Sequence, residues 1–320
     1  MTRRRWLALA AGMAATAYAS QLCLGEDHRQ ILRLAISTDT LAGANVNDVR
    51  AAYKVWTNEV IRQDRIVGAE MVPEIFLTSE EMIRDIRQGT IEGFGITALE
   101  FLKVVNLVDP ESVLLQDYVS DGMEYVLLAH NKGSIKKIAD LKGAQLLVHL
   151  HRDMLLASAW LGTLLAANNL PQAEHFFAGQ KREDNLNQVV LPVFFHRADA
   201  CCLSRRNWET FVELNPQLGR DLGILAISPK LIPNVIAFRR GSSEEARKAL
   251  IDAIFKMASL NAGQQIVALY QSHGFITKPT SVMNGTLQML HDFQRASGQL
   301  GGRGEGRSEV MESSGKGSAR

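Results

Sequence analysis

The stretch DGMEYVLLAHNKGSIKKIADLKGAQLLVHLHRDMLLASAWLGTLLAANNL, residues 121–170, has the pattern of an α/β unit. Residues 123–129 and 144–150 are apolar runs of strand length, separated by a polar, glycine-containing segment. Asp153 can cap the long apolar helix that is predicted for residues 154–168. A strand that leads through a loop into a helix N-terminus is a common ligand site, because the first N–H groups of a helix lack partners.

The segment NKGSIKKIADLKG, residues 131–143, carries a more specific signal. It resembles a turn motif in the second lobe of type 2 periplasmic binding proteins, and most of all the phosphate/phosphonate-binding family of ABC-transporter solute receptors. The similarity extends, more weakly, over residues 32–275. It implies an α/β fold with two lobes of the type 2 periplasmic-binding-protein kind, joined by a hinge of two crossing segments.

The resemblance and the alternation of strands and helices divide the chain into segments. Crossings between the lobes are expected near Asp121 and near Pro233. The C-terminal segment is rich in Gly and Ser, charged and without apolar periodicity, so it is predicted to be disordered. The predicted segments are a signal peptide at 1–19, lobe 1 at 29–120 and 233–292, lobe 2 at 121–232, and a disordered tail at 298–320.

The N-terminus, MTRRRWLALAAGMAATAYAS, has the pattern of an export signal. Arg3–Arg5 form a basic region, residues 6–19 are uncharged and rich in Ala, and Ala17–Ala19 fits a small-x-small cleavage site. The protein is therefore predicted to be periplasmic. The arginines also resemble a twin-arginine motif, so this route and the general secretory route are both open. The alternative to cleavage is a retained anchor.

Composition excludes some partners. The chain of 320 residues has a formal net charge of +1, and removal of residues 1–19 with their three arginines would leave about −2. Such a balance leaves no basic footprint for nucleic acid. The adjacent Cys201 and Cys202 suit small buried side chains, although a disulfide between them or with Cys23 is an alternative in an oxidising compartment.

Polar residues at strand–helix junctions are the ligand candidates of the first lobe. The family resemblance places the end of its first strand and the junction near residue 97 at the ligand, although each residue there can instead serve as a turn or cap. One candidate is Phe101, which stands where the family often has a Tyr. The candidates from this lobe and from the return crossing are Thr38, Thr97, Glu100, Phe101 and Asn234.

The second lobe supplies the remaining candidates. Tyr125 is the strongest single ligand contact that the resemblance implies, with a half-buried strand aromatic as the alternative. The loop after the strand at 144–150 lacks the Ser/Thr-rich segment of phosphonate receptors. Asp153 as helix cap would compete with an anion, whereas Arg152 could hold one. The full set of candidates here is Tyr125, His149, His151, Arg152, Asp153, Asp199 and Arg205.

Several of these candidates have more than one interpretation. His149 and His151 could share a metal site, although we predict no metal and no cofactor. Asp199 could face the ligand or cap a turn. Arg205 could hold an anion or begin a solvated helix.

These features predict an exported solute-binding receptor rather than an enzyme. It would capture a small polar ligand, such as a phosphonate or another oxyanion, between two lobes and deliver it to an ABC permease. A ligand-sensing subunit for a membrane sensor kinase is the alternative, and an enzyme that uses His149, His151 and Asp153 is a further one. An interaction module without a polar ligand site is the third class. We expect a monomer that binds no nucleic acid.

Overall fold

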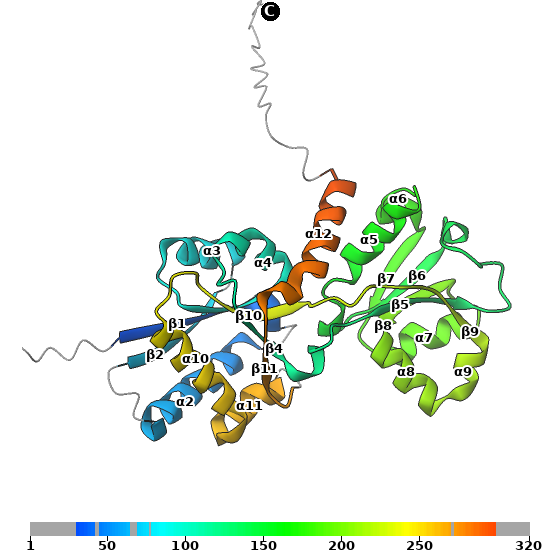
Figure 1. Ribbon diagram of the computed structural model, residues 1–320. Helices are drawn as coiled ribbons and strands as arrows, with labels where there is room; N and C mark the ends of the chain where they lie inside the picture. Colours follow the sequence, from blue (N-terminus) through cyan, green and yellow to red (C-terminus); the bar gives the residue numbers. More distant parts are fainter. Residues whose placement is uncertain (1–29, 42–44, 65–68, 77, 270–271, 299–320) are drawn as a thin grey trace, which may run out of the picture. The chain divides into compact units, whose positions relative to one another are not determined.

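The computed structural model describes residues 30–41, 45–64, 69–76, 78–269 and 272–298. The predicted signal peptide, Cys23 and the tail from residue 299 onward lie outside these described residues. The chain forms two compact units (Figure 1). Of the described residues, the first unit comprises those in 30–120 and Asn234–Ser281, and the second comprises Asp121–Pro233 and 282–298.

The first unit is built on a six-stranded sheet in the order β11-β4-β10-β3-β1-β2. β1 pairs in parallel with β2 and β3, whereas β10 is antiparallel to β3 and β4. Figure 1 shows α3 and α4 on one face of this sheet, and α2, α10 and α11 on the other. The elements are β1 Gln30–Ser37, α2 Val46–Asp64, β2 Ala69–Phe76, α3 Ser79–Gln88, β3 Gly93–Thr97, α4 Ala98–Val104, β4 Val113–Gln116, β10 Asn234–Phe238, α10 Glu244–Lys256, α11 Asn261–Leu269 and β11 Phe275–Lys278.

Alternation along β1 explains the core of this unit. Leu32, Leu34 and Ile36 share one face of the strand and are almost completely buried against α2 and α10. The sequence TSEEMIRDIRQG, residues 78–89, favours a capped helix, and α3 has these caps. The Thr78 side chain accepts a hydrogen bond from the Glu81 N–H, and Gly89 ends the helix with φ of 76°.

The second unit is built on a five-stranded sheet in the order β7-β6-β8-β5-β9. β6 is parallel to β7 and β8, while β5 is antiparallel to β8 and β9. In Figure 1, α7, α8 and α9 cover one face, and α5, α6 and α12 lie on the other. The elements are β5 Tyr125–His130, β6 Gln145–His149, the 3-10 turn η5 Arg152–Met154, α5 Ala157–Ala167, α6 Ala173–Phe176, β7 Gly179–Glu183, α7 Leu186–Phe194, β8 Ala200–Ser204, α8 Arg205–Leu214, α9 Pro216–Asp221, β9 Leu222–Ile227 and α12 Asn284–Ala296.

The C-terminal helix corrects the predicted domain boundary. The sequence assigned residues up to 292 to the first lobe, but α12 belongs to the second unit and packs on α5. The Thr286 hydroxyl accepts a hydrogen bond of 2.8 Å from the Ile232 N–H, and Phe293 lies directly over Gly162. Because Gly162 has no side chain, α12 can pack closely on α5, and this packing assigns α12 to the second unit.

The start of α5 also differs from the prediction. The first turn, η5, is followed by a break, and α5 begins at Ala157 with Leu156 as an N-cap that supplies no side-chain hydrogen bond. Asp153 therefore does not cap the long helix, because its side chain pairs with His151 instead. The sequence of residues 174–178 favours a strand, but α6 occupies this position and the polar segment Gly179–Glu183 forms the edge strand β7 instead.

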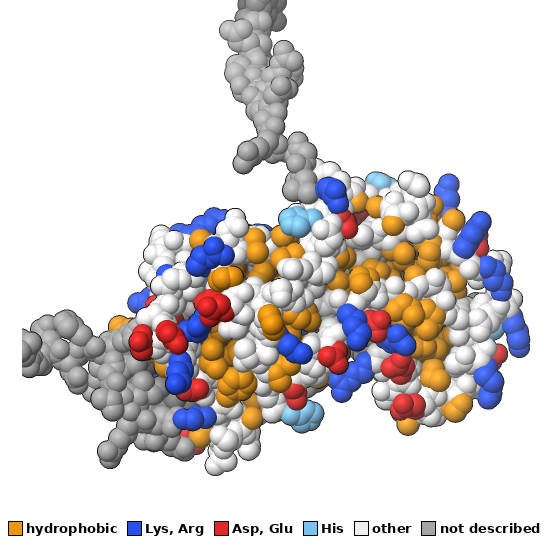
Figure 2. Space-filling view, viewed as in Figure 1, with side chains coloured by type: hydrophobic (Ala, Val, Ile, Leu, Met, Phe, Trp, Pro, Cys, Tyr) orange, Lys and Arg blue, Asp and Glu red, His pale blue; other side chains and the backbone are white. Residues whose placement is uncertain are grey.

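The two adjacent cysteines lie in the middle of β8. Both are free thiols, both are completely buried, and burial raises the pKa of each. In the structure, Cys201 and Cys202 are therefore small buried side chains and not a disulfide. None of the described helices is both long and apolar enough to span a membrane. On the face shown in Figure 2, acidic and basic side chains are interspersed, without a large field of one sign.

Gly162 provides a test of the α5–α12 contact. A Cβ at this position would lie 2.5 Å from a ring carbon of Phe293. We expect Gly162→Ala to lower the free energy of unfolding by about 1–3 kcal/mol, because the ring must be displaced. Urea denaturation measures the change. Phe293→Ala in the same chain should reduce the effect of Gly162→Ala.

The matched control is Gly285→Ala in α12, where a Cβ would meet nothing within 4 Å. This substitution should be neutral or stabilising by up to about 1 kcal/mol, because Ala favours helix more than Gly does. Equal destabilisation at both glycines would contradict the proposed role of the Phe293 contact.

Candidate functional site

Strand ends and helix starts meet at one edge of the first unit. β1 ends at Ser37 directly before a 3-10 turn that begins at Thr38, and β3 ends at Thr97 directly before α4. α3 begins at Ser79, shortly after the end of the parallel strand β2. Carboxyl ends of parallel strands, with helix N-termini above them, are the usual position of a ligand in open α/β sheets.

The carboxylate of Glu100 links these three junctions. One of its oxygens accepts hydrogen bonds from the Ser37 hydroxyl at 2.6 Å and the Ser79 hydroxyl at 2.7 Å. The other accepts from the N–H and the hydroxyl of Thr97, at 2.8 and 2.9 Å. Glu100 is 2% exposed, so this is a buried charge that is stabilised by the chain itself.

This network assigns structural roles to several predicted ligand contacts. Thr97 and Glu100 form a complete capping box at the start of α4, and each hydroxyl proton in the network is already donated to Glu100. Phe101 is completely buried and packs in the core, so its role as a ligand contact remains a prediction. Thr38 begins the 3-10 turn after β1, and Asn234 is a largely buried residue opposite Thr97 on β10.

The second unit has a corresponding edge at the ends of β6 and β8. His149 ends β6 and is buried, with Nε2 3.3 Å from the Asp184 carbonyl oxygen and Nδ1 3.5 Å from the Asn207 side-chain nitrogen. The His151 ring stacks on the His149 ring, with centroids 5.3 Å apart and planes within 5°. The loop therefore presents two imidazoles side by side.

Asp153 is the carboxylate next to these rings. Its side-chain oxygen lies 3.3 Å from His151 Nδ1, and its backbone N–H lies at the same distance from that nitrogen. A neutral Nδ1 can accept from the N–H, whereas a protonated Nδ1 can donate to the carboxylate. Among the described residues, no group of three or more His, Cys, Asp or Glu side chains has a metal-binding arrangement.

Tyr125 begins β5 at the same edge, opposite Ser204. Its side chain is completely buried, and its ring lies 6.0 Å from the Trp160 ring in α5. The hydroxyl has no hydrogen-bond partner among the described residues, although it faces the Leu156 N–H. Burial raises the pKa of this hydroxyl, so it remains protonated and can act as a donor.

Asp199 and Arg205, two predicted ligand contacts of the second unit, have partners within the chain. Asp199 lies at the start of β8, which is the opposite edge from His149, and accepts a hydrogen bond of 2.7 Å from the Gln145 N–H. The side chain therefore joins the starts of the neighbouring strands β6 and β8, away from the edge that carries His149. The Arg205 guanidinium contacts the carboxylates of Glu124 at 3.2 Å and Glu209 at 2.8 Å, so its positive charge is already paired.

A cavity of about 170 Å³ lies beside the histidine loop, between β6, η5 and α5. Its polar groups include Arg182 on β7, whose guanidinium donates a hydrogen bond of 3.2 Å to the Ser158 hydroxyl. The lining consists of Val148, His149, Leu150, His151, Met154, Leu155, Ser158 and Arg182.

Sequence reasoning missed several polar residues at these two edges. Ser79 and Asn207 are first-turn residues of α3 and α8, and Arg182 lies on the edge strand β7. Gln116 is the last residue of β4 and is buried at the first edge. A position at the end of a strand or shortly after it indicates Gln116 and Ser79 as candidates, whereas Arg182 carries no such signal.

Two α/β units with helix N-termini at the carboxyl edges of their strands define the class of two-lobed solute-binding proteins. The model of one such family, described as "ABC transporter, phosphonate, periplasmic substrate-binding protein", matches residues 40–279. The chain belongs to this family. The predicted fold class and the predicted family are thereby confirmed. The comparison with curated proteins gives no match.

Solved structures of the same fold have low sequence identity to this chain. The binding protein component of an ABC phosphonate transporter from Pseudomonas aeruginosa is 14% identical, with a TM-score of 0.50, and the match covers 84% of this chain and 88% of that chain. A Xanthomonas citri protein bound to chloride ion is 17% identical, with a TM-score of 0.55 and coverage of 84% and 99%. The same protein bound to ATP gives 16% and 0.54, with coverage of 84% and 98%.

His149 provides a pH test of the histidine loop. Burial, and secondly the neighbouring His151, lowers the pKa of His149 below its ordinary value of 6.5. The folded protein therefore keeps this ring neutral at pH values where the unfolded chain already binds a proton. We expect the free energy of unfolding to fall as the pH decreases from about 7.5 to about 5.5.

His149→Gln removes the titrating group and should make this part of the pH dependence shallower. Urea denaturation of both proteins at several pH values measures it. An identical pH dependence in the variant would contradict the assignment to His149.

Proposed function

We propose that this chain is the periplasmic receptor of an ABC transporter for a phosphonate-like oxyanion. The N-terminus of α5 in the second unit would hold the oxyanion. Family membership supports the role as substrate-binding component. The observation that carries the ligand assignment is the uncapped start of α5, which lies against a buried hydroxyl without a partner.

The first unit contributes few donors for an anion. The hydroxyl protons of Ser37, Ser79 and Thr97 are all donated to Glu100, and a hydroxyl has only one proton to donate. The buried Glu100 carboxylate also adds a negative charge at this edge. An oxyanion placed here would therefore find no free proton on these three hydroxyls. The negative charge of the Glu100 carboxylate would also repel it, which disfavours binding.

The start of α5 offers the opposite environment. Leu156, its N-cap, supplies no side-chain acceptor, so no described side chain caps the helix. The helix has 11 residues, and its dipole places partial positive charge at this end. The Tyr125 hydroxyl faces the Leu156 N–H and could donate to the same anion.

The residues before α5 adjust the charge of this position. Arg152 and Asp153 both belong to η5, directly before α5. Because the Asp153 carboxylate lies next to His151, a protonated His151 would neutralise it. Arg152 adds a planar guanidinium to the same turn, a group that suits bidentate contact with an oxyanion.

The wider role follows from the family. A receptor of this kind would work in the periplasm and pass its ligand to a permease. The twin-arginine route, cleavage of residues 1–19 and the monomeric state remain predictions. The family and the similar solved structures give no support to the sensing alternative or to the enzyme alternative.

Arg152→Ala tests the oxyanion assignment. We expect the variant to bind methylphosphonate or inorganic phosphate about tenfold more weakly or worse, because an oxyanion loses a charged partner. Isothermal titration calorimetry and ligand-dependent thermal shifts of the mature protein measure the change.

Arg205→Ala is the matched control. Its guanidinium is already paired with Glu124 and Glu209, so the variant should bind with nearly unchanged affinity. Equal loss of affinity in both variants would indicate a nonspecific effect of charge. An unchanged affinity in Arg152→Ala would remove this residue from the site.

A further inference from the structure

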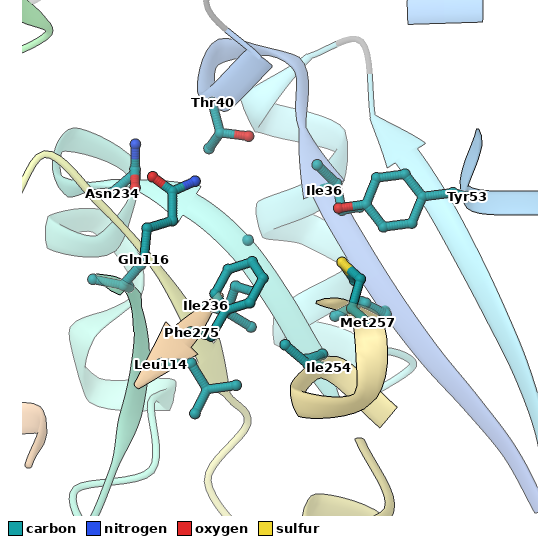
Figure 3. Close-up of a pocket in the computed structure, with 13 residues that line it drawn as sticks. Ile36, Thr40, Tyr53, Leu114, Gln116, Asn234, Ile236, Ile254, Met257 and Phe275 are labelled. Atoms are coloured by element: carbon teal, nitrogen blue, oxygen red, sulfur yellow. The ribbon is translucent and has the colours of Figure 1, made fainter. Parts of the chain in front are cut away.

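Two of the cavities in this chain differ in the charge of their linings. The cavity inside the first unit (Figure 3) has a volume of about 30 Å³, and none of the described residues that line it is acidic or basic. A charged group would lose its hydration there without a counter-charge, which is strongly unfavourable. The cavity of about 170 Å³ in the second unit, between β6, η5 and α5, has Arg182 in its described lining and no carboxylate. This second cavity therefore suits an anionic group.

Arg182 has a positive charge that no carboxylate of the described residues pairs with. Its guanidinium donates a hydrogen bond of 3.2 Å to the Ser158 hydroxyl, and the residue is exposed, so a ligand can reach it. The remaining N–H groups of the planar guanidinium can bind two oxygens of a carboxylate or phosphoryl group. The preceding residue differs, because Lys181 Nζ lies 2.6 Å from a Glu183 carboxylate oxygen. Successive strand residues point to opposite faces, so Lys181 faces away from the cavity.

Ser158 connects this cation with the start of α5. The first hydrogen bond into the helix runs from the Trp160 N–H to the Leu156 carbonyl, so the Ser158 N–H belongs to the N–H groups that lack an intrahelical partner. The side chain of the same residue accepts the hydrogen bond from Arg182. A short ligand can therefore contact the N–H groups of α5 with one anionic group and Arg182 with another, and both contacts lie within the second unit.

The lining supplies further donors for an anionic group. The Ser158 hydroxyl accepts from Arg182, so its own proton is still available for donation. When the neutral His151 ring accepts from the Asp153 N–H through Nδ1, at 3.3 Å, its proton is on Nε2. The other side chains of the lining are mostly apolar and suit a short carbon chain between two anionic groups.

We propose that this cavity of the second unit binds a second anionic group of the ligand, and that Arg182 determines this specificity by direct contact. The inference rests on the proposed function, because the first anionic group is the oxyanion at the start of α5. The ligand class is then a phosphonate that carries a carboxylate or a second phosphoryl group on a short carbon chain, rather than a phosphonate with a neutral or cationic substituent.

The test compares three phosphonates of similar size and different charge. Isothermal titration calorimetry at a single pH would measure the binding of phosphonoacetate, ethylphosphonate and 2-aminoethylphosphonate to the purified protein. We expect phosphonoacetate to bind about tenfold more tightly than ethylphosphonate, which corresponds to one hydrogen bond to a charged group. The ammonium of 2-aminoethylphosphonate would be repelled by the Arg182 guanidinium, so this compound should bind no more tightly than ethylphosphonate. The comparison uses only the natural chain, so it does not depend on the folding of a variant.

Arg182→Gln then tests the residue. The variant should lose the preference for phosphonoacetate while it binds ethylphosphonate as the natural chain does. Lys181→Gln is the matched control, because it removes the same charge from the next position of β7, where the ammonium is already paired with Glu183. This control should keep the preference. A thermal melt checks that both variants fold.

The outcomes separate the two proposals. Equal affinity for phosphonoacetate and ethylphosphonate, preference for the amine, a preference that persists in Arg182→Gln, or one that is lost equally in Lys181→Gln would overturn this inference and leave the proposed function intact. If none of the three phosphonates binds, the proposed function fails and this inference fails with it.

Discussion

The unpaired N–H groups at the start of each helix are the constraint on which both units depend. Each unit brings strand ends and helix starts together at one edge of its sheet, and the free N–H groups there must find acceptors. The first unit satisfies this need internally. Glu100 caps α4 and binds the hydroxyls of Ser37 and Ser79, so one carboxylate links three chain segments.

In the second unit, the N–H groups at the start of α5 have no side-chain acceptor among the described residues. Leu156 cannot cap the helix, and Asp153 is turned toward His151. The buried Tyr125 hydroxyl at the same position has no hydrogen-bond partner within the described part of the chain. The two edges therefore differ: one is a structural junction around the Glu100 carboxylate, and the other is the edge at which we propose that an oxyanion binds.

Sequence alone determined the alternation of strands and helices, the caps of α3 and the family, because these depend on local periodicity and on short motifs such as residues 131–143. It also located Glu100, His151 and Tyr125 near strand ends. It could not show that Arg205 is paired with Glu124, that Asp199 lies at the opposite edge, or that Phe101 is core. Tertiary structure alone decided those points and the place of α12, because partners distant in sequence, such as Gly162 and Phe293, determine burial, pairing and helix packing.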